Sequence, residues 1–171
     1  MLYYVRRAEP SDLNNILKVI ENGRETLRKS GIPQWQNNEG PNQVRIEEDL
    51  SLDEGYVLIE QDKIVGYGTI TKGNQAGYGE ITGGEWLPSK EYVSLHRVAI
   101  HSGIRERGKG QFFLSHLISG AIALGHTDIR IDTHPKNMRM QKVIEKSGFL
   151  YRGDILLEVT DGERKAYQII I

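Results

Sequence analysis

Residues 101–111 form a basic loop punctuated by glycines, with the sequence His-Ser-Gly-Ile-Arg-Glu-Arg-Gly-Lys-Gly-Gln. A strand-like segment precedes the loop and a strongly helical segment follows it. Glycines let a backbone approach an anion closely, and the first N–H groups of a helix have no partner within that helix. Between Gly103 and Gly110 the loop carries three basic residues and one acid. These features predict a site for a small phosphorylated ligand.

Three known phosphate-binding patterns can be compared with this loop. The ATP/GTP P-loop, G-x-x-x-x-G-K-[ST], fits from Gly103, but Gly110 stands where a hydroxyl should bind magnesium. The dinucleotide fingerprint, G-x-G-x-x-G, fits from Gly108, but Phe113 replaces its third glycine. The pattern [QR]-x-x-G-x-[GA] is satisfied by Arg105, Gly108 and Gly110. The loop favours this third pattern, and a P-loop-like ATP-dependent kinase is the alternative.

The third pattern resembles the acyl-coenzyme A loop of the GNAT family of N-acetyltransferases. Residues 95–100, which precede the loop, are similar to the family's L-x-x-hydrophobic-x-V strand. Residues 137–149 look like a second family motif, N-x-x-A-x-x-hydrophobic-Y-E-K-x-G-F. Residues 4–13 are similar to the family's first strand and helix start. The Ile-Pro-Gln-Trp segment at 32–35, together with Trp86, resembles a bacterial branch of the family whose substrate is uncharacterised.

The elements that must position this loop alternate along the chain as strands and helices. We expect one domain, residues 1–171, with an α/β (α+β) fold. Its central sheet is expected to be mixed, mostly antiparallel and of about seven strands, with helices flanking it; the family resemblance implies that the central strands splay apart. Apolar spacing predicts helices over 13–20, 44–50, 114–121 and 140–144, and strands over 3–7, 56–60, 64–71, 81–87, 92–100, 128–133, 154–159 and 165–171.

Composition narrows the class of protein. The chain has 171 residues, no cysteine and a formal net charge of −1. It therefore has no disulfide or thiolate metal site, and its charge does not favour nucleic-acid binding. No apolar stretch reaches the length of a membrane span, and the start of the chain lacks the pattern of a signal peptide. We expect a cytoplasmic protein without a metal, a membrane or a nucleic acid as partner.

The resemblance implies how acetyl-coenzyme A, the acyl donor, is held. The pantetheine arm is expected to lie between two splayed strands, along the backbone of residues 98–100. The diphosphate is expected on the N–H groups at the start of the following helix, where the helix dipole favours an anion. Asn137 is expected to orient the pantetheine arm. The implied coenzyme-binding residues are Val98, Ala99, Ile100, Arg105, Glu106, Arg107, Gly108, Lys109, Gly110, Gln111 and Asn137.

The implied reaction moves an acetyl group from the thioester to a primary amine of a small molecule or a protein. A protonated amine must lose a proton before it attacks, and a thiolate must leave. The family's usual acid, a tyrosine, is replaced here by Ile144, so Tyr151, Tyr92 or water would have to protonate the sulfur, or the thiolate leaves unprotonated. Candidate bases are His96, Glu80, Glu85, Asp132 and His134. For His96 the sequence favours a structural role, as a half-buried strand histidine held by a hydrogen bond, over catalysis. Our candidate catalytic residues are His96, Glu85, Asp132 and Tyr151.

Substrate contacts are expected from bulky or polar residues near the strand ends. Trp35 lies in an irregular loop and either closes over the site or caps the core. Trp86 and His134 complete the candidate substrate-binding set. The replacement at Ile144 leaves open a non-catalytic module that only senses acyl-coenzyme A. The resemblance is also compatible with a homodimer.

Overall fold

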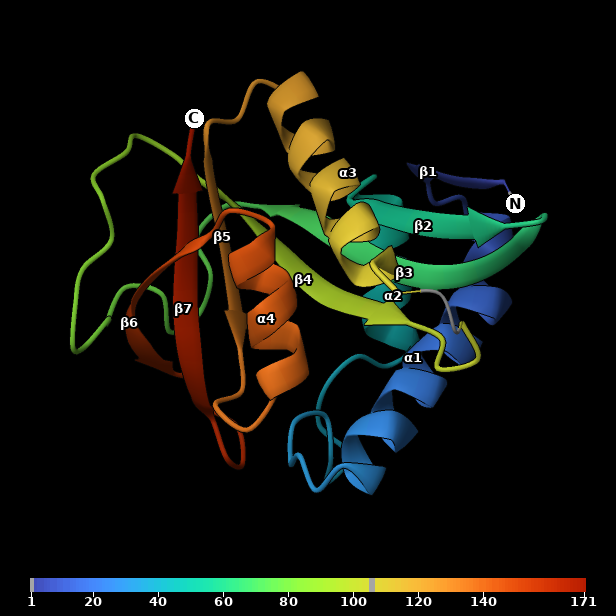
Figure 1. The fold of residues 1–171 in the computed structure, drawn as a ribbon, viewed down its shortest axis with the longest axis horizontal. Helices are drawn as coiled ribbons and strands as arrows, with labels where there is room; N and C mark the ends of the chain where they lie inside the picture. The colour runs from blue at the N-terminus through green and yellow to red at the C-terminus, as the bar shows by residue number, and fades with distance from the viewer. Residues whose placement is uncertain (1, 105–106) are drawn as a thin grey trace.

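A computed structural model describes residues 2–104 and 107–171 of the chain. Its strands join one seven-stranded sheet, which two helices cover on each face (Figure 1). The strands are β1 (Tyr3–Arg7), β2 (Gly55–Glu60), β3 (Lys63–Lys72), β4 (Val93–Ile100), β5 (Asp128–Thr133), β6 (Leu150–Leu156) and β7 (Glu163–Ile170). The helices are α1 (Leu13–Lys29), α2 (Gln43–Ser51), α3 (Lys109–Ala123) and α4 (Met138–Lys146), preceded by a 3-10 turn at Pro10–Asp12.

The sheet has the order β1-β2-β3-β4-β5-β7-β6, and every neighbouring pair except β4–β5 is antiparallel. The parallel pairing of β4 with β5 covers only residues 93–95 of β4. Beyond Leu95 the two strands separate, and β4 continues to Ile100 beside β3 alone. The predicted mixed sheet with splayed central strands is therefore confirmed.

Two apolar clusters fix the helices on the sheet. One lies under α3 and α4 and includes Phe113, Leu117 and Ile144, all fully buried. The other lies under α1 and α2 and includes Ile16 and Ile46. Because the helices present one apolar stripe each, burial of these stripes selects the two-sided packing.

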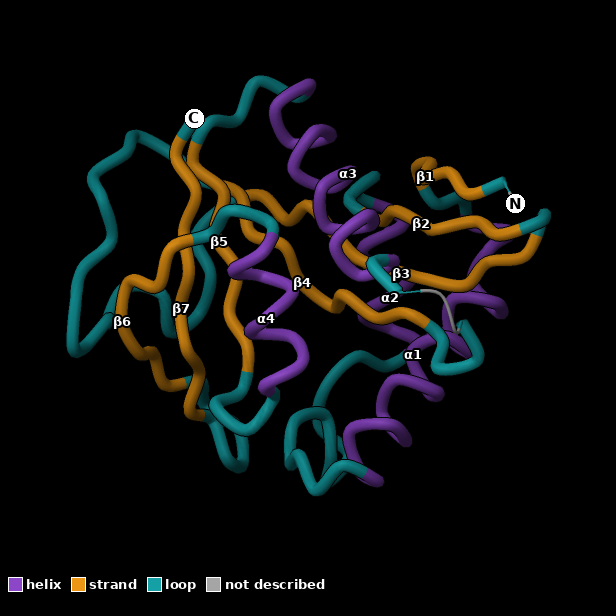
Figure 2. The backbone as a smooth tube through the Cα atoms, viewed as in Figure 1, coloured by secondary structure: helices purple, strands orange, loops and turns teal. Residues whose placement is uncertain are grey.

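Residues 81–87 do not form the predicted strand. Apart from one isolated bridge between Thr82 and Asp154, they belong to a long loop outside the strands at the β6 end of the sheet (Figure 2). Gly83 has a φ of 68°, and a Cβ at Gly84 would lie 1.9 Å from the Arg152 carbonyl oxygen. This close backbone approach and the left-handed turn interrupt the apolar alternation that suggested a strand.

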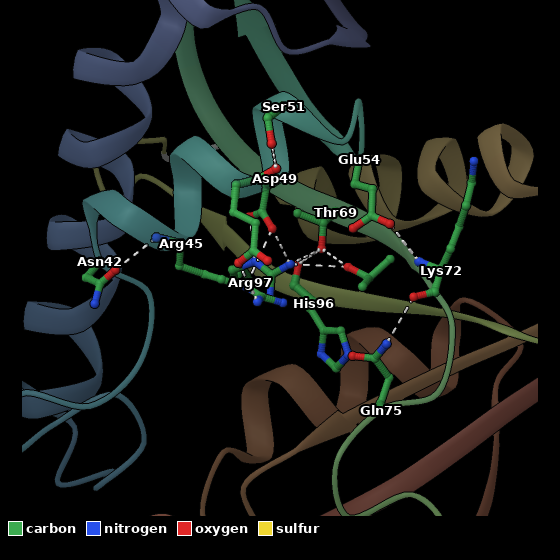
Figure 3. A network of polar contacts seen from close by, with 12 residues as sticks. Asn42, Arg45, Asp49, Ser51, Glu54, Thr69, Lys72, Gln75, His96 and Arg97 are labelled. Atoms are coloured by element: carbon green, nitrogen blue, oxygen red, sulfur yellow. Dashed lines mark hydrogen bonds and ion pairs between the residues drawn. The ribbon is translucent and has the colours of Figure 1, made fainter.

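A buried ion pair holds the bend in β4. The register of β4 on β3 shifts by one residue at a bulge, where Arg97 has a φ of 54°. Its guanidinium donates to both carboxylate oxygens of Asp49 at 2.7 Å, and also to Thr69 and Thr71 (Figure 3). Tyr67 donates a further bond to Asp49 at 2.8 Å, and burial raises the pKa of its hydroxyl. The pair thus ties the bulge to α2.

Asp49→Leu is expected to destabilise the protein by about 3–5 kcal/mol, because Arg97 then remains buried without a counter-charge. The double variant Asp49→Leu/Arg97→Met removes both charges and should recover at least about half of that loss. Urea unfolding of the three proteins measures the free energies. A double variant less stable than the single one would contradict this role of the pair.

Candidate functional site

A cleft of about 770 Å³ opens where β4 and β5 separate. Its walls come from α1 and the following loop, from β4, from the start of α3, and from α4. β5 and the β6–β7 hairpin close the remaining side. Segments far apart in the sequence therefore meet at one place, which is the splayed gap.

The backbone of β4 exposes hydrogen-bonding groups to this gap. The His101 N–H donates to the Val65 carbonyl in β3 at 2.8 Å. Since N–H direction alternates along a strand, Ala99 also faces β3, whereas Val98 and Ile100 face the opposite edge, where β5 has departed. Val98, Ala99 and Ile100 all line the cleft. The N–H groups of Val98 and Ile100 are thus placed to pair with an extended ligand, and Ala99 contributes its side chain to the wall.

The start of α3 faces the same cleft. Gly108 is the N-cap, with a φ of 87°, and residues 107–111 line the cleft. Arg105 and Glu106, both predicted to bind the coenzyme, lie outside the described residues. The Lys109 ammonium lies 3.0 Å from the centre of the Tyr3 ring.

Two side chains near this helix start are held by local bonds. Gln111 donates to the Lys146 carbonyl oxygen in α4 at 2.9 Å. The Oδ1 of Asn137 caps α4 by accepting from the Met140 N–H at 3.1 Å, and Asn137 lines the cleft. Its Nδ2 donates one hydrogen to Gln34 Oε1 at 3.5 Å, so the second hydrogen of Nδ2 is the one that can reach a ligand.

The cleft is strongly positive although the chain is nearly neutral. Among the described residues that line it, eight are basic and two, Glu39 and Asp132, are acidic. Five of the basic residues lie just before α3, in its first turn, or in α4. The basic residues are Arg45, Arg97, Arg107, Lys109, Arg139, Lys142, Lys146 and Arg164.

His96 lies in the cleft as an electrically neutral imidazole. Its side chain is 20% exposed, and its Nε2 atom is buried with no hydrogen-bond partner. Burial lowers its pKa to about 3, with further lowering by the charges of Arg97 and Arg45. A base with so low a pKa has little power to remove a proton from an ammonium group. His96 is thus a poor general base, and its neutral imidazole instead suits a hydrogen bond to a ligand.

Asp132 lies beside His96 and is 8% exposed. Its Oδ2 accepts from the Tyr78 hydroxyl at 2.7 Å and lies 3.9 Å from His96 Nδ1, and its Oδ1 lies 3.7 Å from Arg164 Nε. Burial raises the pKa of Asp132, whereas the hydrogen bond from Tyr78 and the charge of Arg164 lower it by less. Arg130, two residues earlier on β5, pairs with Asp128 at 2.8 Å. Asp132 is thus a carboxylate of raised pKa that lines the cleft, where Tyr78 and Arg164 hold it in place.

Trp35 satisfies both interpretations that the sequence left open. It lines the cleft and also packs against the apolar cluster under α1 and α2. Its ring lies 2.9 Å from where a Cβ of Gly40 would stand and 3.3 Å from one on Gly23. Glycines at these two positions therefore let the loop close over the indole.

Several candidates lie away from the cleft. Glu80 and Glu85 are exposed on the 73–92 loop. Trp86 donates to the Tyr78 carbonyl oxygen at 2.7 Å and stacks on the Tyr78 ring. The Tyr92 hydroxyl oxygen accepts a hydrogen bond from the backbone N–H of Gln75, in the same loop, at 2.9 Å. These residues pack the loop onto the sheet and do not reach the splayed gap.

Hydrogen bonds hold two further candidate residues, His134 and Tyr151, at positions that do not line the cleft. His134 is 3% exposed and its Nδ1 accepts from the Lys136 N–H at 3.1 Å, in the turn before α4. Tyr151 is 45% exposed on β6, where its hydroxyl donates to Asp154 at 2.9 Å. Ile144 is fully buried in the core. Neither Tyr151 nor the position of Ile144 therefore supplies an acid to the cleft.

Tyr78 is the site residue that the sequence analysis missed. Of the eight tyrosines, it is the one that lines the cleft within the described part of the chain. Burial raises the pKa of its hydroxyl well above the ordinary value, with Asp132 adding to the effect. It lies in a glycine-rich stretch that reads as an exposed connection, so no local pattern marked it. Three further residues that line the cleft, Glu39, Arg45 and Arg164, were also missed, because no motif distinguishes them from ordinary charged residues.

Among the residues that the structure describes, no group of three or more histidine, cysteine, aspartate or glutamate side chains is arranged to hold a metal ion. None of the helices in residues 2–104 and 107–171 has the length and apolarity needed to cross a bilayer.

Comparison with known proteins identifies the family. The model of the acetyltransferase (GNAT) family matches residues 24–149. A GNAT acetyltransferase structure from Streptococcus agalactiae is 35% identical, with a TM-score of 0.90 over 99% of this chain and 95% of that one. A GNAT structure from Listeria monocytogenes shares the fold at 19% identity, with a TM-score of 0.71 over 99% and 95% of the two chains. No curated protein matches the chain.

These matches define the class. The chain belongs to the GNAT family of acetyltransferases, whose acyl donor is acetyl-coenzyme A. Its cleft fits that donor, because the backbone edge of β4 and the start of α3 open into one space lined by basic residues.

Gly108→Val is expected to weaken coenzyme A binding at least tenfold, because the left-handed conformation is strained for a β-branched residue and the helix start must shift. Gly125→Val is the matched control: Gly125 follows α3 with a φ of 90°, and a Cβ at either glycine meets no atom within 4 Å. Calorimetric titration of coenzyme A measures both affinities. Equal losses in the two variants would contradict the assignment of the loop.

The buried neutral His96 predicts a pH-dependent stability. Between about pH 6.5 and 3 the unfolded chain binds a proton on this histidine and the folded chain does not, so stability falls as the pH falls. His96→Gln removes this dependence. From pH 7 to pH 5 the wild-type protein should therefore lose about 2 kcal/mol more than the variant in urea unfolding. His116→Gln, at an exposed position on α3, is the control, and parallel curves for wild type and His96→Gln would contradict the prediction.

Proposed function

We propose that this protein transfers an acetyl group from acetyl-coenzyme A directly to a primary amine. The observation that carries the proposal is that the open backbone edge of β4 and the N-terminus of α3 face one cleft, which also holds Asp132 and Tyr78. The β4 edge and the start of α3 suit the binding of a thioester donor, and Asp132 and Tyr78 suit proton transfer.

The donor's phosphates would lie at the start of α3. The N–H groups of residues 109–111 and the helix dipole favour an anion there, and Arg107 with the basic residues of α4 adds charge. The pantetheine arm would run along Val98 and Ile100, with Asn137 Nδ2 as an additional donor. This arrangement directs the thioester toward residues 96–98, on the side where Asp132 lies.

The chemical step needs a proton acceptor and a donor for the developing oxyanion. Asp132, with its raised pKa, would take one proton from the substrate ammonium, after which the free amine attacks the thioester carbon. The Val98 N–H would stabilise the negative charge that grows on the carbonyl oxygen. The carbon–sulfur bond then breaks, the nitrogen loses its second proton, and the products are the acetylated amine, the coenzyme A thiol and one released proton.

The phenol of Tyr78 lies in the cleft and could protonate the departing sulfur. The raised pKa of Tyr78 keeps its hydroxyl protonated at neutral pH, and that hydroxyl points to Asp132. Tyr78 can therefore donate its hydroxyl proton to the sulfur while Asp132 holds the proton that it took from the ammonium group. A thiol of ordinary pKa, about 8.5, also leaves as the thiolate, so Tyr78→Phe should slow the reaction less than Asp132→Asn.

Asp132→Asn is expected to lower kcat by about 10²–10⁴-fold, because the amide cannot accept the ammonium proton. Release of free coenzyme A thiol is followed over a panel of primary amines from pH 6 to 10. The variant's rate should recover as the pH rises toward the amine's own pKa, where the free amine no longer needs a base. Asp154→Asn, on the exposed edge strand β6, is the control. A pH-independent deficit would contradict the role of Asp132 as base.

Ligand binding separates the two other candidate functions. At about 100 times its dissociation constant, acetyl-coenzyme A should stabilise the protein by roughly 2.7 kcal/mol, and ATP with magnesium should not. Stabilisation by ATP alone would contradict acetyl transfer and favour a kinase. Stabilisation by acetyl-coenzyme A without thiol release from any amine would favour the sensing module.

A further inference from the structure

Not all of the arginines that line the cleft lie beside the proposed phosphate site. The basic residues next to and within the start of α3 and on α4 would bind the phosphates, on the α3/α4 face of the sheet. Three further arginines line the cleft on other elements: Arg45 on α2, Arg97 on β4 and Arg164 on β7. Arg45 and Arg97 meet at Asp49, on the α1/α2 face of the sheet (Figure 3).

We propose that Arg45 and Arg97 bind an anionic group of the acetyl acceptor, so that the acceptor is a small amine that also carries a carboxylate. This inference rests on the proposed transfer to an amine and names the class of that amine. The acceptor's ammonium group would lie at Asp132, and its carboxylate at the two arginines. His96 lies 3.9 Å from Asp132 and is also acted on by the charges of both arginines.

The arginines retain hydrogen-bonding capacity after their internal pairing. Arg97 uses Nε and Nη2 on Asp49, Thr69 and Thr71, and its Nη1 takes part in none of these bonds. Arg45 pairs with Glu48 at 2.9 Å and lies 3.7 Å from Asp49, and its side chain is 42% exposed. Two carboxylates, the buried Asp49 and the exposed Glu48, partner the two guanidinium groups. Neither carboxylate bonds to Arg97 Nη1, and both arginines line the cleft, so each can still donate to a ligand there.

The surroundings of His96 give independent support. Burial is the main cause of its lowered pKa, and the charges of Arg97 and Arg45 lower the pKa further, so both arginines act on the imidazole. Its Nε2 is buried and lacks a partner, which is a cost that a ligand can remove. A neutral imidazole donates from one nitrogen and accepts at the other, so it can bond to an acceptor that spans from Asp132 to the arginines.

The walls of the cleft favour a small acceptor. Glu39, in the loop after α1, accepts bonds at 3.0–3.1 Å from the backbone N–H and hydroxyl of Thr160, in the β6–β7 hairpin. This contact joins two segments that line opposite sides of the cleft. A short molecule fits beneath such a contact, whereas an extended polypeptide would have to break it.

The test compares matched acids and amides as acceptors. The panel contains the ω-amino acids from glycine to 6-aminohexanoate and the L-α-amino acids, each beside its primary carboxamide, which keeps the shape and removes the charge. We expect the best acid to exceed its amide at least tenfold in kcat/KM for thiol release. Arg45→Gln should reduce this preference to less than threefold, whereas Arg28→Gln, an exposed position on α1, should preserve it.

Calorimetric titration of the same compounds into the coenzyme A complex separates this inference from the proposed function. Acids that bind tenfold tighter than their amides, without thiol release, would support the anion site and contradict acetyl transfer. Amides that react as well as their acids would overturn the anion site and leave acetyl transfer supported. Acids that neither bind nor react, or reaction confined to polypeptide amines, would overturn the inference.

Discussion

The early end of the pairing between β4 and β5 is the constraint on which the rest of the structure depends. Only residues 93–95 of β4 pair with β5, and the strand then continues with one edge open. An unpaired backbone edge inside a protein is costly unless another group satisfies it. Here the edge opens into the cleft, and α3 starts beside it, so one geometric feature supplies both a strand-like partner for an extended ligand and an anion site.

The bulge in β4 makes this geometry possible, and the Asp49–Arg97 pair maintains it. Arg97 adopts a left-handed conformation that is unfavourable for a residue with a side chain. Two short bonds to Asp49 on α2 hold it, with Thr69 and Thr71 of β3 alongside. The same arginine lines the cleft, so the interaction that shapes the strand also contributes to the charge of the site.

Much of the fold followed from the sequence, but less of the site did. The glycine loop and the 137–149 motif have fixed spacing, so they predicted the family and the splayed sheet. Tyr78 lies in a glycine-rich loop without periodicity, and only the folded chain brings it to Asp132. The pKa of His96 depends on burial and on Arg45, which is distant in the sequence. The prediction of a strand over 81–87 was wrong because the backbone at Gly84 lies against the backbone at Arg152.

Backbone amide exchange followed by NMR, with and without coenzyme A, tests the central claim most directly. If the open edge of β4 holds the donor, the N–H groups of Val98 and Ile100 and those of residues 109–111 should gain protection together when coenzyme A binds. The amide of His101, already bonded to β3, should change little. Protection confined to other segments, with Val98 and Ile100 unchanged, would contradict the account.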